Sequence, residues 1–166
     1  MLGMTPFGML HTAIALVAVA GGILAFVRHG EISSRTRSGR AYVWFTVATC
    51  ITGLFIFHHG GFGAPHILAI TTLIVLVIAY AAETRISQRG LAHYVAVLGY
   101  SLTFFFHFIP GLTETGTRVP VGHPAFTGPE DPTLKMLVGV CFLIYLIGAA
   151  VQAANIRRTQ RLAGTA

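Results

Sequence analysis

Histidines are the residues of this chain whose type and placement could do chemistry. Eight are present, and five of them lie near those ends of long apolar segments that we expect on the same side of a membrane: His11, His58, His59, His66 and His107. Neutral imidazole is the commonest ligand for transition metals and a frequent axial ligand of haem. Several histidine rings near the same ends of apolar segments therefore predict either a ligand site or a hydrogen-bonded network.

Four of these rings form the set that we call the outer histidine cluster: His11, His58, His66 and His107. Ionisable residues within a membrane usually face the bundle interior or a cavity. We expect this cluster to bind haem b or a transition-metal ion, and a structural hydrogen-bond network without any cofactor is the open alternative. His66 follows Pro65, so it either caps the segment that begins there or acts as a ligand. His59 and His123 are expected to be solvated loop residues.

A second spacing involves His93. It lies 14 residues before His107, so on a helix the two rings point to nearly the same face with a rise of roughly 21 Å. Transmembrane cytochromes of the b type often carry two such histidines on one helix, one for each of two haems. His93 is therefore a possible inner ligand, and the alternative is an interface anchor. His29, between Arg28 and Gly30, is expected to be interfacial.

The elements that must position these rings are apolar helices. Of the 166 residues, 54% are hydrophobic and only 10% charged, and the mean hydropathy is +0.74; a soluble domain carries roughly a quarter charged residues. Continuous apolar runs without alternation favour helices, which satisfy their own backbone in lipid. We predict an all-α, polytopic, five-helix bundle forming a single integral membrane domain over residues 1–166. The predicted spans are residues 7–27, 41–58, 65–82, 92–110 and 135–154.

The basic residues predict the topology. The sequence has 11 lysines and arginines, and nine fall on one side of a five-span model: Arg28, Arg35, Arg37, Arg40, Arg85, Arg89, Arg157, Arg158 and Arg161. The positive-inside rule then places the N-terminus outside, in the periplasm, and the C-terminus in the cytoplasm. We expect a multi-pass protein of the bacterial inner membrane that contacts the lipid bilayer. The charges are topology determinants, so no nucleic-acid partner is expected.

Other features carry little chemistry. Cys50 and Cys141 lie inside apolar runs without a CxxC spacing, which indicates small core hydrophobes. The first apolar run lacks a basic leader and is expected to be an uncleaved helix. Residues 111–134 form a long outer loop, either an ordered cap or irregular. No phosphate-binding or nucleophile motif is present. A transporter would normally show a polar stripe along its spans, and the sequence shows none. Glu83 is expected to pair with Arg85 or a nearby basic loop.

Several short patterns carry a resemblance to a known family. They are Gly39–Arg40, the Gly-Phe-x-x-x-His turn at 61–66, Ala92–His93 and the run Ile-Pro-Gly-x-Thr-Glu-Thr at 109–115. Through roughly residues 35–131 the chain resembles the bacterial membrane-protein family filed as domain of unknown function 2306. The resemblance implies a small helical membrane protein and brings no established activity. Relatives are expected to carry a His-Arg pair at 35–36, where this chain has Arg35–Thr36.

Two functions follow from the residues. The first is electron transfer by a haem or metal bound through His107 and a partner among His11, His58 and His66. The second is a non-catalytic accessory subunit that packs against a larger respiratory or photosynthetic complex, with its histidines merely hydrogen-bonded. Whether the protein is an enzyme stays open at this point.

Overall fold

A computed structural model describes residues 5–57, 61–85 and 90–164 of the chain. The described residues form five α-helices: α1 (Pro6–His29), α2 (Arg37–Leu54), α3 (Ala64–Thr84), α4 (Leu91–Gly116) and α5 (Pro132–Gly164). The prediction of an all-helical protein is confirmed.

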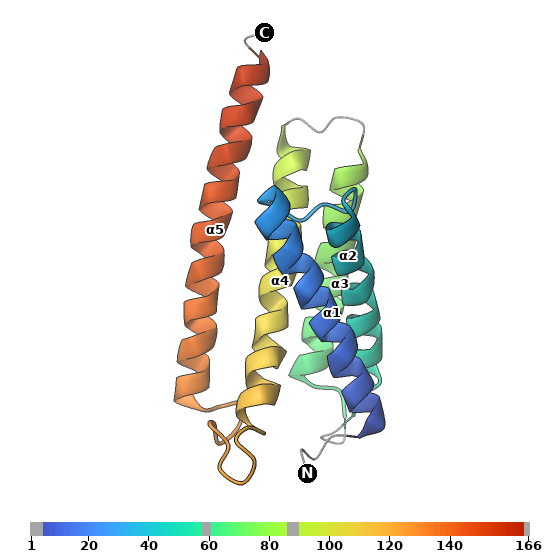
Figure 1. Ribbon diagram of the computed structural model, residues 1–166, viewed down its shortest axis with the longest axis vertical. Coiled ribbons are helices and arrows are strands. Elements are labelled where there is room, and N and C mark those ends of the chain that lie inside the picture. Colours follow the sequence, from blue (N-terminus) through green and yellow to red (C-terminus); the bar gives the residue numbers. More distant parts are fainter. Residues whose placement is uncertain (1–4, 58–60, 86–89, 165–166) are drawn as a thin grey trace.

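The helices run alternately up and down along the long axis of the molecule, which leaves the two termini at opposite ends (Figure 1). Helix α1 packs on α2, α2 on α3 and α3 on α4, and a smaller contact between α4 and α1 closes the group into a four-helix core. Helix α5 packs against α4 alone among the described helices, and it extends beyond its neighbours at the C-terminal end (Figure 1).

Four of the described helices are long and apolar enough to cross a membrane: α1, α3, α4 and α5. Helix α2 is less apolar because it carries Arg37 and Arg40 in its first turn and polar residues along its buried side. That buried side includes Tyr42 and Thr46, which are both fully buried. A helix that faces its neighbours needs fewer lipid-compatible side chains than one that faces lipid.

The helices begin and end at residues other than those that bound the predicted apolar runs. Helix α2 begins at Arg37, because the Thr36 hydroxyl accepts a 3.1 Å hydrogen bond from the Gly39 amide as an N-cap. Helix α4 continues through Pro110 to Gly116, so the outer connection is shorter than predicted. Helix α5 runs ten residues past the predicted end at 154, into the basic segment. Hydropathy does not detect such turns, which lie beyond the apolar runs.

The outer connection folds back on the bundle. Phe126 is buried, and its amide donates a 3.0 Å hydrogen bond to the carbonyl of Gly116 at the end of α4. A Cβ atom at residue 116 would lie only 2.1 Å from the Phe126 ring, so the contact requires glycine. Part of the loop therefore forms an ordered cap.

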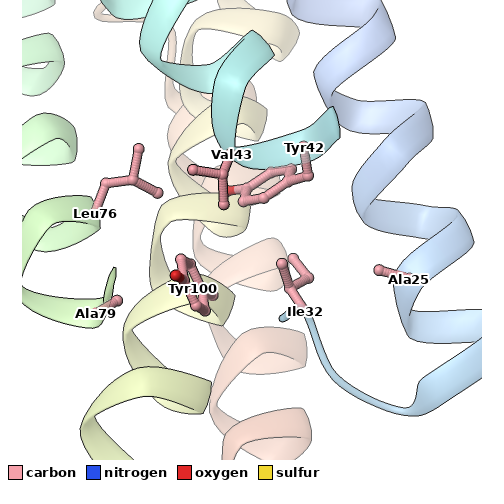
Figure 2. Close-up of a cluster of buried hydrophobic side chains, with 7 residues drawn as sticks. All are labelled: Ala25, Ile32, Tyr42, Val43, Leu76, Ala79 and Tyr100. Atoms are coloured by element: carbon pink, nitrogen blue, oxygen red, sulfur yellow. The ribbon is translucent and has the colours of Figure 1, made fainter. Parts of the chain in front are cut away.

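The hydrophobic core lies among the first four helices. Its buried cluster comes from α1, α2, α3, α4 and the α1–α2 connection: Ala25, Ile32, Tyr42, Val43, Leu76, Ala79 and Tyr100 (Figure 2). Helix α1 approaches closely at Gly22, where a Cβ atom would lie 2.6 Å from the Phe104 ring. The two tyrosines in this cluster bring hydroxyl groups into the centre of the bundle, where they need partners.

Candidate functional site

His107 lies on α4 and faces the four-helix core. Its Nδ1 atom is 3.0 Å from the carbonyl oxygen of Thr103, one turn earlier. A carbonyl only accepts, so Nδ1 must carry the proton and donate. In the neutral ring the lone pair is then on Nε2, which among the described residues has a long contact of 3.5 Å with the Thr46 hydroxyl. The Tyr42 ring lies beside the imidazole at a centroid distance of 5.8 Å.

His11, on α1, is oriented in the same way by α2. Its Nδ1 is 2.8 Å from the hydroxyl of Thr52. That hydroxyl donates its single proton to the main-chain carbonyls of its own helix, 2.8 Å from Ala48 and 3.1 Å from Thr49. It must therefore accept from His11, so Nδ1 of His11 carries the ring proton and Nε2 holds the lone pair. The ring packs on bare backbone, because a Cβ at Gly53 would lie 3.3 Å from its Cε1.

His11 and His107 are thus two rings, on different helices, with the same protonation pattern. They are close enough to interact electrostatically, and His11 also interacts with Glu114. Histidines that bind metals commonly donate their second ring N–H to a carbonyl or another oxygen, which fixes the tautomer. Both rings already have this arrangement.

His66 is oriented the opposite way. The Gly63 amide donates a 3.2 Å hydrogen bond to Nδ1, so the ring proton is on Nε2. The ring is only 4% exposed and stacks between Phe57 and Phe62, at centroid distances of 4.9 and 5.2 Å. Its Nε2–H is buried and has no partner among the described residues. His66 therefore caps α3, and Nε2 of the neutral ring presents an N–H donor, whereas a metal would require a lone pair there.

The remaining histidines of the prediction lie elsewhere. His58 and His59 lie outside the described residues. His93 is at the opposite end of the bundle, where its Nε2 is 3.8 Å from a carboxylate oxygen of Glu31. In the described part of the chain, no three histidine, cysteine or acidic side chains form a group that could hold a metal ion. Of the outer histidine cluster, His11 and His107 are the described pair that interact electrostatically.

Glu83 is a buried polar centre whose partners come from the basic α1–α2 connection, one of the two expectations for it, and from Tyr100 on α4. Its carboxylate is 8% exposed at the end of α3. It accepts hydrogen bonds from the Ser33 hydroxyl at 2.6 Å, from the amide and hydroxyl of Ser34, and from the Tyr100 hydroxyl at 2.8 Å. Arg35 donates to the main-chain carbonyl of Glu83 at 2.8 Å. These donors, rather than Arg85, tie the α1–α2 connection to α3 and α4.

Further polar groups lie between Glu83 and His107. The Thr103 hydroxyl donates to the carbonyl of Tyr100 at 2.9 Å and accepts from the Tyr42 hydroxyl at 2.8 Å. Tyr42 and Thr103 are fully buried. A polar stripe therefore exists, although none was predicted, because its members come from different helices. The hydroxyl bonds within it end on a main-chain carbonyl, so this network orients side chains and does not form a continuous chain of exchangeable protons.

Comparisons with protein-family models, with curated proteins and with solved structures find no match for this chain. The resemblance to the family of domain of unknown function 2306 stays a prediction.

Proposed function

We propose that this protein binds haem b or a transition-metal ion between His11 and His107 and transfers electrons within the membrane. The observation that carries the proposal is the shared orientation of the two rings. Each Nδ1–H is held by an oxygen of the protein, at 2.8 Å for His11 and 3.0 Å for His107, which leaves each Nε2 with a lone pair. Such outer partners orient a ligand and raise its basicity.

Haem fits this donor set better than a bare ion. A porphyrin supplies four nitrogens to its iron, so two imidazoles complete the coordination. A zinc ion in a protein usually takes three or four protein ligands, and the described residues offer no such group. Bound there, haem would supply one-electron transfer. The protein's own part is to present two neutral nitrogens and to exclude water with Tyr42 and the neighbouring α4 side chains.

The proposal includes five membrane crossings with the N-terminus outside. It rests on the alternating direction of the five described helices and on the segregation of the basic residues (Figure 1). Helix α2 would cross as the least apolar of the five spans, and its 18 residues give a length of roughly 27 Å. The His11–His107 pair would then lie in the periplasmic half. Reporter domains fused after residues 34, 60, 88 and 125 should alternate in location, and two consecutive fusions on the same side would contradict the five-span topology.

An absorption spectrum tests the cofactor directly. The full chain is purified in detergent, from cells supplied with a haem precursor, and spectra are recorded before and after dithionite reduction. Haem ligated by two histidines should give a Soret band and a sharp α-band in the reduced state, and metal analysis should show about one iron per chain. The absence of both the Soret band and any stoichiometric metal would overturn the proposal.

A second candidate is the accessory subunit of a larger membrane complex. It is favoured by α5, which packs only on α4 and leaves large apolar side chains exposed, among them Leu143, Ile144 and Ile147. A protein partner, as well as lipid, could cover this face. Mild-detergent purification distinguishes the two: an accessory subunit should co-purify with a complex, and replacement of His107 should leave that association intact.

A further inference from the structure

Two cavities follow one another between α4 and α5. The first, about 790 Å³, lies where α4 begins and α5 ends. It is lined by Tyr94 and by alanines and arginines of α5, the arginines being Arg157, Arg158 and Arg161. No described acidic side chain lines it, so this end of the α4–α5 surface attracts anions.

The second cavity, about 460 Å³, lies farther from the C-terminus of α5. Its walls are aromatic, including Phe104, Phe105, Phe108 and Tyr145, and its floor on α5 includes Gly148 and Ala149. A Cβ atom added at Gly148 would meet nothing within 4 Å, so the small residue leaves room for a guest.

The dimensions of this cavity match an acyl chain. Its α5 wall runs from Cys141 to Gln152, a rise of roughly 16 Å, which is about half of a 30 Å bilayer core and hence the depth of one leaflet. At the end nearest the arginines the wall becomes polar. There Ser101 donates to the Gln152 side chain at 2.8 Å, and Gln152 donates to the Gly30 carbonyl at 3.0 Å. Arg157 follows roughly 7 Å farther along α5.

We propose that the α4–α5 slot, made of these two cavities, is a binding site for one anionic phospholipid. The phosphate contacts Arg157, Arg158 and Arg161, and one acyl chain occupies the aromatic cavity. Arginine presents a planar set of donors that matches phosphate oxygens, and basic pockets between membrane helices are known settings for anionic headgroups. The arginines and the apolar cavity in line identify a lipid more specifically than either would alone.

Native mass spectrometry of the full chain in detergent tests the site. Phosphatidylglycerol, phosphatidylcholine with the same acyl chains, and soluble glycerol phosphate are titrated separately. We expect phosphatidylglycerol to bind at one molecule per chain, and the other two to bind much more weakly. The double variant Arg157→Ala/Arg158→Ala should lose about thirtyfold in affinity for phosphatidylglycerol, since each basic side chain near a membrane contributes about 1 kcal/mol.

Matched variants separate the headgroup from the chain. Gly148→Leu fills the aromatic cavity and should weaken binding, whereas Gly139→Leu should not, because residue 139 is also in open space and does not line the cavity. Arg28→Ala/Arg85→Ala removes the same charge at the same end of the bundle and should leave binding unchanged. Equal binding of the two phospholipids would overturn the proposal. So would glycerol phosphate binding as tightly as the lipid, which would indicate a site for a free anion.

Discussion

Thr52 accepts a hydrogen bond from His11 across the α1–α2 interface, at 2.8 Å, because its own proton is already donated to the carbonyls of Ala48 and Thr49. The direction of this bond decides which nitrogen of His11 is available to a ligand. Thr103, through its carbonyl, does the same for His107. Two oxygens from different helices thereby give both rings an unprotonated Nε2.

The first prediction concerns Thr52. Thr52→Val keeps the shape of the side chain but removes the acceptor of the His11 proton, so the ring is no longer held in one tautomer. Loss of such a second-sphere partner typically costs 10–100-fold in metal affinity, and we expect a loss of that order for haem. Thr52→Ser restores the hydroxyl and should restore affinity, measured by titrating apo-protein with haemin. Equal affinities for the valine and serine variants would show that the bond does not orient a ligand.

A second prediction concerns Glu83. Glu83→Ala leaves the part-buried donors of Ser33 and Ser34 and the buried hydroxyl of Tyr100 without their acceptor. Each unsatisfied buried group costs about 1–3 kcal/mol, so we expect a loss of about 3 kcal/mol or more and a clear drop in the melting temperature in detergent. Tyr100→Phe removes only one of the bonds and should cost about 1 kcal/mol. If Glu83→Ala has the same melting temperature as the native protein, this network does not hold the helices together.

Gly39 provides a test of the α1–α2 turn. A Cβ atom there would lie 2.0 Å from the carbonyl oxygen of Ser33, which is backbone and cannot move aside cheaply. Gly39→Ala should therefore destabilise the protein by about 1–3 kcal/mol, as overpacking does. Gly139→Ala on α5 has open space and should be neutral or slightly stabilising, because alanine favours a helix. Similar melting temperatures for the two variants would contradict the described packing of Ser33 on α2.

Asp131 predicts a pH dependence at the start of α5. Hydrogen bonds from the amides of Thr127 and Thr133 lower the pKa of this exposed carboxyl below its ordinary value of 3.8. Because the folded-state pKa is the lower one, the stabilisation is complete above pH 3.8 and is lost as the pH falls through the lowered pKa. The protection of the Thr127 and Thr133 amides against exchange, relative to their intrinsic rates, should therefore be lost only at strongly acidic pH.

The control for this effect is Asp131→Asn, which removes the titrating group. The protection of the Thr127 and Thr133 amides in this variant, relative to their intrinsic exchange rates, should no longer change between pH 5 and the acidic limit of the native protein. Glu130→Gln, next to it, should leave the profile of Thr133 unchanged, because Glu130 pairs with Lys135 instead. An unchanged acid profile in the asparagine variant would exclude Asp131 as the titrating group.

The helices could be predicted because long apolar runs report lipid contact directly. The first and last residues of the helices were harder to predict, because the Thr36 cap and the polar extensions of α4 and α5 lie outside those runs. The capping role of His66 has a local signal, since Gly63 is three residues before it, at the position of an N-cap. Glu83 has none, because Ser33 and Ser34 lie about 50 residues away and periodicity does not record tertiary pairing.

For the histidine site, the sequence could predict which histidines lie near one end of the helices, but not the tautomer of each ring. Sequence placed His11, His66 and His107 near one level, but ring tautomers depend on which oxygen or amide each Nδ1 meets. Those partners, Thr52, Gly63 and the carbonyl of Thr103, separate two rings with a lone pair on Nε2 from one with a proton there.

The most direct test is haemin titration of apo-protein in detergent, followed at the Soret band, for the native chain and the variants His11→Ala, His107→Ala and His66→Ala. We expect the native protein and His66→Ala to bind about one haem with a six-coordinate spectrum, and His11→Ala and His107→Ala to lose that spectrum. Native-like spectra in both the His11 and His107 variants, or loss in His66→Ala alone, would contradict this expectation.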